Sequence, residues 1–143
     1  MDNVFAYLCY MKQLAVVLPS GDPLLSSIVL TEELLAKAND YFISRGRQAV
    51  FKVSLVGDAA GGTISSGRFT VRLHKRIQDP YHADLVMIPS LGNDIKTAVT
   101  RDKKLISWIT HQYKNGAEVA GLCTGVFMVA AAGLLKGKQC STH

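Results

Sequence analysis

The sequence predicts an α/β protein in which a mostly parallel sheet is covered by helices on both faces. Two apolar runs, at 14–18 and 83–88, are short and continuous, as is typical of strands buried on both sides. Other segments, at 26–44 and 102–114, carry apolar residues at helical spacing. Strands that alternate with helices form parallel sheets with right-handed crossovers, so we expect one doubly covered sheet.

The first third of the chain is expected to form a strand, a loop and a long helix. The strand at 14–18 runs into a loop containing Pro and Gly, and the helix begins with Ser26 or Ser27 as its cap and ends at Ser44. The apolar stripe of this helix is predicted to comprise Leu30, Leu34, Leu35, Ala38, Tyr41 and Phe42.

The remaining elements continue the alternation. Strands are expected at 49–56, 69–73 and 83–88, a turn-rich excursion at 57–67, and a helix at 102–114 that turns Leu105, Ile106, Trp108 and Ile109 inward. A strand, a turn carrying Cys123 and a helix through Ala132 come next, and a last strand is expected at 139–142.

Length and composition limit the classes of protein that are possible. A chain of 143 residues forms one domain, and 48% hydrophobic with 19% charged residues is ordinary for a soluble protein. No apolar run approaches the ~18 residues of a membrane span. Residues 1–13 lack the features of a secretion signal and are interpreted as an N-terminal extension. We therefore expect a cytoplasmic protein without a membrane partner.

The cysteines and the charged residues indicate the compartment of the protein and the kinds of partner that it binds. Three cysteines without metal-type spacing and four scattered histidines fit a reducing compartment, and we expect neither a metal nor a cofactor. The net charge of +5 comes from 16 basic and 11 acidic residues. The densest basic stretch, Arg68–Arg76, alternates as a strand does, which favours a solvated basic face over a nucleic-acid groove.

Residues 118–128 hold the feature most indicative of chemistry, a sharp turn with Cys123 between a strand and a helix. Gly121 and Gly125 flank the cysteine, and their lack of a Cβ permits a tight turn and a helix packed close behind it. The free N–H groups of the helix start favour a thiolate over a thiol. The alternative is a small cysteine that is buried where strand meets helix, and both interpretations stay open at this point.

Ligands of such sheets bind outside the carboxyl ends of the strands, where the loops after Leu18 and Ile88 should meet Cys123. The turn Pro89–Gly92, together with the N–H of Thr124, offers donors for an oxyanion hole, although a plain strand-ending turn explains it equally well. The predicted edge of a small-molecule pocket consists of Gly21, Ser27, Ser90, Leu91, Cys123 and Thr124.

Three segments resemble a known family. They are Gly121-Leu122-Cys123-Thr124-Gly125-Val126-Phe127, then 132–138 (AGLLKGK), then Ser141-Thr142-His143. The pattern is similar to the ThiJ/PfpI branch of the class I glutamine amidotransferase-like superfamily, which has a flavodoxin-like fold. Within that branch it most resembles the N-terminal domain of GlxA-type, AraC-family transcriptional regulators. The resemblance covers residues 14–143.

The resemblance implies a site and also shows where this chain departs from the family. Cys123 takes the position of the elbow cysteine and His143 that of its partner histidine. The position of the family's acidic residue falls on Ser27, which cannot act as a carboxylate. The family's Pro-Gly-Gly turn is replaced by Pro89-Ser90-Leu91. The resemblance further implies a strand-helix segment and a helix-turn-helix domain beyond His143, so we expect a piece of a longer regulator.

Three functions from different classes remain open. The first is a ligand-sensing, dimerising domain of an AraC-family regulator with an unknown small-molecule effector, whose DNA binding resides in a domain outside this chain. The second is a cysteine-dependent hydrolase or deglycase of the PfpI type that uses Cys123 and His143. The third, a glutaminase, is disfavoured because its downstream His-x-Glu partner has no room here. The changes at Ser27 and Ser90 favour the sensor.

Overall fold

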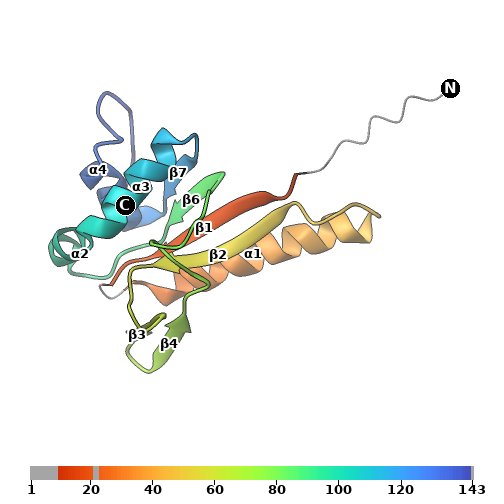
Figure 1. Ribbon diagram of the computed structural model, residues 1–143, viewed down its shortest axis with the longest axis horizontal. Helices are drawn as coiled ribbons and strands as arrows, with labels where there is room; N and C mark the ends of the chain where they lie inside the picture. The colour runs from red at the N-terminus through yellow and green to blue at the C-terminus, as the bar shows by residue number, and fades with distance from the viewer. Residues whose placement is uncertain (1–9, 21–22, 143) are drawn as a thin grey trace.

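The computed structural model describes residues 10–20 and 23–142, which build a five-stranded parallel sheet between two helical layers (Figure 1). The strand order is β5-β2-β1-β6-β7, and all neighbouring strands pair in parallel. These strands are β1 (Lys12–Leu18), β2 (Phe51–Gly57), β5 (Lys75–Arg76), β6 (Leu85–Ile88) and β7 (Glu118–Gly121). The predicted fold class is therefore confirmed.

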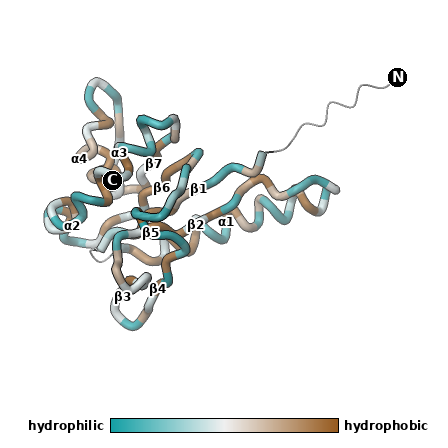
Figure 2. The backbone as a smooth tube through the Cα atoms, in the orientation of Figure 1, coloured by the Kyte–Doolittle hydropathy of each residue, from teal (hydrophilic) through white to brown (hydrophobic). Residues whose placement is uncertain are grey.

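The central strand β1 divides the core into two halves because its side chains alternate between the two faces of the sheet. Ala15 and Val17 contribute to a core shared with the helices α2 to α4, whereas Leu14, Val16 and Leu18 belong to a core shared with α1. The helices are α1 (Leu25–Ser44), α2 (Ile95–Arg101), α3 (Lys103–Lys114) and α4 (Val126–Ala131). Figure 2 shows the hydrophobic colouring that runs through these central strands.

The orientation of α1 differs in part from the predicted apolar stripe, of which Leu35 does pack against the core. Ile28 and Thr31 are the buried residues of this helix, whereas Leu30, Leu34 and Tyr41 are more than half exposed. The sequence carries apolar residues at helical spacing on two faces, so periodicity alone could not decide which face meets the sheet. The outer face of α1, defined here by Leu30, Leu34 and Tyr41, is thus an apolar surface without cover from the described residues.

The start of α1 also differs from the prediction. Leu24 occupies the N-cap position, and no side chain caps the helix there. The Ser27 hydroxyl instead donates a hydrogen bond to the carbonyl of Leu24 at 2.7 Å. Ser27 therefore lies inside the first turn of the helix and is not its cap.

The excursion after β2 contains a strand that the sequence did not reveal. β3 (Thr63–Ser66) pairs antiparallel with β4 (Phe69–Arg72) in a separate two-stranded sheet. The basic stretch Arg68–Arg76 is thereby divided between this hairpin and the edge strand β5. The sequence did not reveal β3 because its residues are mostly polar and follow glycines, and because it lacks the apolar run that is typical of the central strands.

Two further expectations for the later part of the chain need correction. Residues 139–142 form no strand, so the predicted final strand is wrong. The helix α2 was missed because its seven residues span barely two turns and show no long apolar period.

Of the expected N-terminal extension 1–13, residues 1–9 lie outside the described residues, and β1 already begins at Lys12. No helix in the described part of the chain is long and apolar enough to cross a membrane.

Candidate functional site

The predicted turn at Cys123 is present at the carboxyl end of β7. Cys123 has a φ of 49°, and among the described residues it is the non-glycine residue with a positive φ. Its side chain is exposed. A left-handed conformation is unfavourable for a residue with a Cβ and persists only when its surroundings hold it. The strand-turn-helix prediction is therefore confirmed, and the alternative of a buried cysteine is excluded.

Two close backbone approaches hold this turn in place. A Cβ on Gly125 would lie 2.5 Å from the carbonyl oxygen of Ile88 and 2.6 Å from that of Pro89. A Cβ on Gly121 would lie 2.8 Å from the backbone nitrogen of Val126. These distances exclude a side chain at either glycine. Gly125 is required for the turn to pack against the end of β6, and Gly121 for the start of α4 to pack close to β7.

Thr124 connects the turn at Cys123, called the elbow from here on, to the turn that follows β6. Its buried hydroxyl accepts a hydrogen bond from the N–H of Leu91 at 2.8 Å and donates one to the carbonyl of Leu91 at 2.9 Å. The hydroxyls of Thr124 and Ser90 lie 2.9 Å apart and share a further hydrogen bond. Both side chains are buried. The carboxyl ends of β6 and β7 therefore meet as the sequence predicted.

Ser27 connects the same turn to α1. Its hydroxyl oxygen accepts a hydrogen bond from the N–H of Ser90 at 3.1 Å. In the opposite direction, the N–H of Leu24 donates to the carbonyl of Ser90 at 3.0 Å. Ser27, which the resemblance aligns with an acidic residue, thus serves here as a neutral connection between α1 and the turn.

These contacts change the interpretation of the turn Pro89–Gly92. The N–H of Ser90 is donated to Ser27, and the N–H of Leu91 is donated to Thr124. An oxyanion hole requires N–H groups that are aimed at the substrate. Two of the donors that the sequence offered for this purpose are engaged within the protein, so the turn has the structure of a fixed pocket wall.

The loop after β1 is held by a buried carboxylate. Asp102 is 5% exposed, and it accepts hydrogen bonds from the backbone N–H of Ser20 at 3.0 and 3.1 Å and from the Ser20 hydroxyl at 2.6 Å. Because Asp102 lies at the junction of α2 and α3, it ties these helices to the carboxyl end of β1. The loop after β1 is thereby fixed to the α2–α3 junction.

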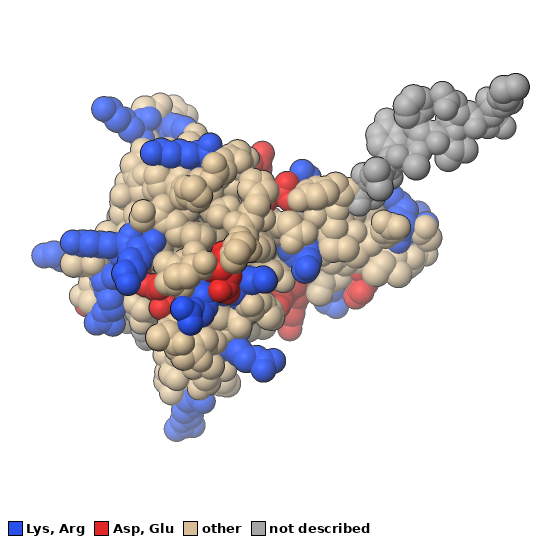
Figure 3. Space-filling view, viewed as in Figure 1, with Lys and Arg blue, Asp and Glu red and all other residues tan. Residues whose placement is uncertain are grey.

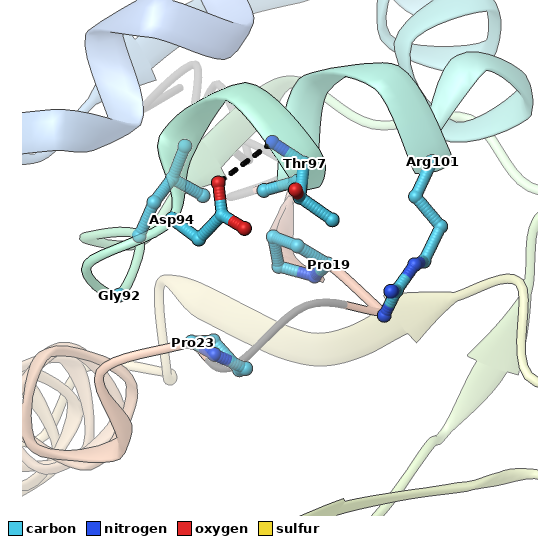
Figure 4. A pocket seen from close by; sticks show the side chains of 8 residues that line it. Pro19, Pro23, Gly92, Asp94, Thr97 and Arg101 are labelled. Carbon is cyan, nitrogen blue, oxygen red and sulfur yellow. Dashed lines mark hydrogen bonds between the residues drawn. The ribbon is translucent and has the colours of Figure 1, made fainter.

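A cavity of about 160 Å³ opens at this edge (Figure 4). Its walls are Pro19, Pro23, Leu91, Gly92, Asp94, Thr97, Ala98 and Arg101. In Figure 4, Asp94 and Arg101 lie at opposite ends, with Pro19 between them. Hydrogen bonds from the hydroxyl and the N–H of Thr97 hold the pKa of Asp94 below its ordinary value, and the charge of Arg101 acts in the same direction. The cavity thus combines an apolar floor with one charge of each sign.

Apart from Cys123, the predicted site residues divide into two groups. Ser27, Ser90, Leu91 and Thr124 form one hydrogen-bonded unit next to Cys123. Gly21 and His143 lie outside the described residues. Sequence reasoning missed Asp94, Thr97 and Arg101, which belong to the unrecognised helix α2. The Asp-x-x-Thr spacing of an N-cap was the available signal, because Asp94 accepts from the N–H of Thr97 at 3.0 Å.

Within residues 10–20 and 23–142, no group of three or more His, Cys, Asp or Glu side chains is arranged to hold a metal ion.

The fold and the elbow together define a class of protein. A family model for the DJ-1/PfpI family matches residues 28–143, and the chain therefore belongs to this family. The mostly parallel sheet flanked by helices is consistent with this family.

Several solved structures share the fold. A protein from Vibrio parahaemolyticus, proposed to be a transcriptional regulator, aligns with a TM-score of 0.74 and 22% identity over 92% of this chain and 67% of its own. DJ-1beta of Drosophila melanogaster aligns with a TM-score of 0.64 and 16% identity over 87% of this chain and 61% of its own.

A third structure, proposed to be protease I of Bacteroides thetaiotaomicron, aligns with a TM-score of 0.65 and 16% identity over 92% of this chain and 74% of its own. At these identities the likeness concerns the fold alone. The chain spans less than two thirds of the Drosophila protein's length. A search of curated proteins found no significant match.

Proposed function

We propose that this chain is the ligand-sensing domain of a transcriptional regulator of the AraC type, with a small-molecule effector bound at the carboxyl edge of the sheet. DNA binding resides in a further domain outside this chain. Membership of the DJ-1/PfpI family supports this proposal, as does the shared fold with the proposed regulator from Vibrio parahaemolyticus. The resemblance of the Cys123 segment to GlxA-type regulators is the basis for the finer assignment.

One observation carries the proposal, namely the internal use of the N–H groups of Ser90 and Leu91. A hydrolase must present such donors to the charge that develops on its substrate, and losing one donor lowers kcat by about 10²–10³. Here Ser27 and Thr124 already accept these hydrogen bonds. Ser27 also lacks the carboxylate that would assist a thiol. The geometry therefore favours binding without turnover.

The cavity beside Leu91 is the proposed effector pocket. Leu91 forms one of its walls, and the N–H and carbonyl of this residue are held by Thr124, next to Cys123. An effector in the cavity would thus contact a wall that is connected directly to the elbow. Asp94 and Arg101 offer polar contacts at the two ends, and Pro19, which lies between them, offers an apolar contact.

A cysteine-dependent hydrolase or deglycase of the PfpI type is the second candidate. The observation that favours it is the strained and exposed Cys123, whose φ of 49° is the conformation that places a nucleophile above a sheet. In this alternative, His143 is the partner of the cysteine. The two functions differ in one measurable property, because only the enzyme consumes its ligand in a reaction that depends on Cys123.

Assembly as a homodimer is part of the proposal, since regulators that read paired DNA half-sites are two-fold symmetric. The outer face of α1 offers the contact surface. Leu34→Glu is expected to shift the chain toward monomer in sedimentation velocity. Ala36→Glu adds the same charge at another exposed position of α1 and should leave assembly unchanged. If both variants sediment with the same proportion of dimer, the interface lies elsewhere than on the outer face of α1.

The effector pocket is tested by thermal unfolding with a panel of amino acids, short carboxylates and small amides. A compound at a hundredfold excess over its Kd stabilises the folded state by about 2.7 kcal/mol. Arg101→Ala is expected to reduce this gain. Arg45→Ala, which removes an arginine that stacks on Tyr41, is the matched control and should retain it. A gain unchanged in Arg101→Ala would contradict the assignment of the pocket.

A further inference from the structure

Besides the basic stretch Arg68–Arg76, a second group of positive charges lies on α2 and the start of α3. Residues 95–114 contain five Lys and Arg side chains, and the acidic residue among them, Asp102, is buried against Ser20. Figure 3 shows blue side chains gathered at the end of the molecule where Figure 1 places α2. The basic surface is defined here as Lys96, Thr100, Arg101, Lys103 and Lys104, all of which are exposed.

Stabilisation of the helices does not explain this charge. Lys103 and Lys104 occupy the first turn of α3, and Lys96 occupies the first turn of α2. Positive charges at a helix start oppose the helix dipole, which favours acidic residues there. Neither first turn contains an acidic residue, and the carboxylate of Asp102 faces Ser20 and does not cap α3. The lysines therefore act against the stability of the helices that carry them.

Ion pairing within the protein does not explain the charge either. Among the described residues, the salt bridge within 4.0 Å is that of Lys12 with Asp84, on a different part of the sheet. Asp94, which precedes α2, interacts electrostatically with Arg101 but accepts its hydrogen bond from Thr97. Within the described residues, the lysines of the basic surface therefore form no salt bridge, and their charge is accessible to a partner.

The composition of this surface indicates which partner fits. An open hollow of about 450 Å³ is lined by Lys96, Thr97, Thr100 and Arg101. Contacts to a nucleic-acid backbone are made by Lys, Arg and hydroxyl side chains and need no apolar anchor. Protein partners usually require such an anchor. None of the large exposed apolar side chains of the described residues falls between Ile95 and Gln112.

We propose that the basic surface of α2 and α3 binds the phosphate backbone of nucleic acid without reading its sequence. The surface does not include the Cys123 elbow, but it shares Arg101 with the wall of the proposed effector cavity. In a regulator, it would hold DNA against the sensing domain in addition to the contacts of a dedicated DNA-binding domain. Affinity from such contacts falls steeply with salt, because bound phosphates release counterions.

The test is the affinity of the chain for a fluorescent duplex of random sequence, measured by anisotropy at several salt concentrations. Four phosphate contacts predict a slope of about −3.6 in log K against log salt, and a roughly 100-fold loss between 50 and 200 mM salt. The triple variant Lys96→Gln, Lys103→Gln, Lys104→Gln should retain a slope near −0.9. The matched control neutralises three exposed lysines elsewhere, Lys37→Gln, Lys52→Gln, Lys136→Gln, and should keep the wild-type slope.

The outcomes separate position from net charge, since both triple variants lose three positive charges. An equal change of slope in both, or a wild-type slope shallower than about −1, would overturn the proposal. Tighter binding of polyglutamate than of DNA would also overturn it and assign the surface to an acidic protein. Circular dichroism checks the fold of each variant. If the triple variant unfolds, Lys103→Gln alone must lower the slope by about 0.9.

Discussion

The Thr124 side chain satisfies both backbone polar groups of Leu91, accepting its N–H at 2.8 Å and donating to its carbonyl at 2.9 Å. Leu91 belongs to the turn after β6, whereas Thr124 follows the elbow cysteine after β7. A single hydroxyl thus fixes the elbow relative to a wall of the cavity. Because both residues are buried, water cannot replace these hydrogen bonds without a rearrangement of the site.

Removal of this hydroxyl is expected to destabilise the protein markedly. Thr124→Val keeps the shape of the side chain but leaves the N–H and the carbonyl of Leu91 without partners, which costs about 1–3 kcal/mol for each buried group. Urea denaturation should show a loss of about 2 kcal/mol or more. Thr100→Val removes an exposed hydroxyl bonded to the carbonyl of Lys96 and serves as the control. Equal losses in the two variants would refute the special role of Thr124.

A methyl group at Gly125 is expected to separate the elbow from the end of β6. In Gly125→Ala, the added Cβ meets two carbonyl oxygens at 2.5 and 2.6 Å, and neither belongs to a flexible side chain. The strain should lower the free energy of unfolding by about 2 kcal/mol or more, with a matching fall of Tm in a calorimetric scan. Gly61→Ala is the control, since its Cβ would meet only the Thr63 hydroxyl oxygen, at 4.0 Å. A Gly125→Ala protein as stable as Gly61→Ala would contradict the packing described for the elbow.

Asp84 is expected to make the stability of the sheet depend on pH. A hydrogen bond from the N–H of Gln13 at 2.8 Å, together with Lys12, holds the pKa of Asp84 below its ordinary value. In the unfolded chain the pKa of an Asp carboxyl is about 3.9. Because the pKa is lower in the folded state, ionised Asp84 stabilises the folded protein at pH values above about 3.9, and this contribution disappears as the pH falls through the folded pKa.

Asp84→Asn should therefore be less stable than the wild type at neutral pH, by about 0.5–1 kcal/mol after solvent screening. The difference should shrink below about pH 3.9, as measured by urea denaturation across the pH range. Asp40→Asn removes the same charge from an exposed position of α1 and controls for net charge. A difference that stays constant down to strongly acidic pH would argue against an ionic role of Asp84.

The sequence determined the order of the sheet elements well because the central strands are continuous apolar runs. β1 and β6 follow from this pattern, and β2 and β7 follow from the alternation of strands with helices. The elbow follows from Gly121 and Gly125 around Cys123. Shorter elements carry too few residues to show a period, which is why β3 and α2 were missed. The face that α1 turns inward was mispredicted for a related reason, since two of its faces are apolar.

The candidate site was only partly predictable. The segments that meet at the carboxyl edge follow from parallel topology, and this places Ser90 near Thr124. Which backbone N–H groups are engaged depends on side-chain geometry that spacing cannot specify, so the role of Ser27 as an acceptor could not be foreseen. Arg101 and Asp94 reach the cavity through the short helix α2, which the sequence did not reveal.

The central claim, that the site binds a small molecule without turning it over, is tested most directly by turnover assays. Wild-type protein and Cys123→Ser are each incubated with a peptide, a p-nitrophenyl ester and methylglyoxal, and substrate loss is followed over time. Because the N–H groups of Ser90 and Leu91 are engaged within the protein, both proteins should consume every substrate at the rate of buffer alone. Substrate consumption by the wild type that is abolished in Cys123→Ser would contradict the sensing function and establish the enzyme.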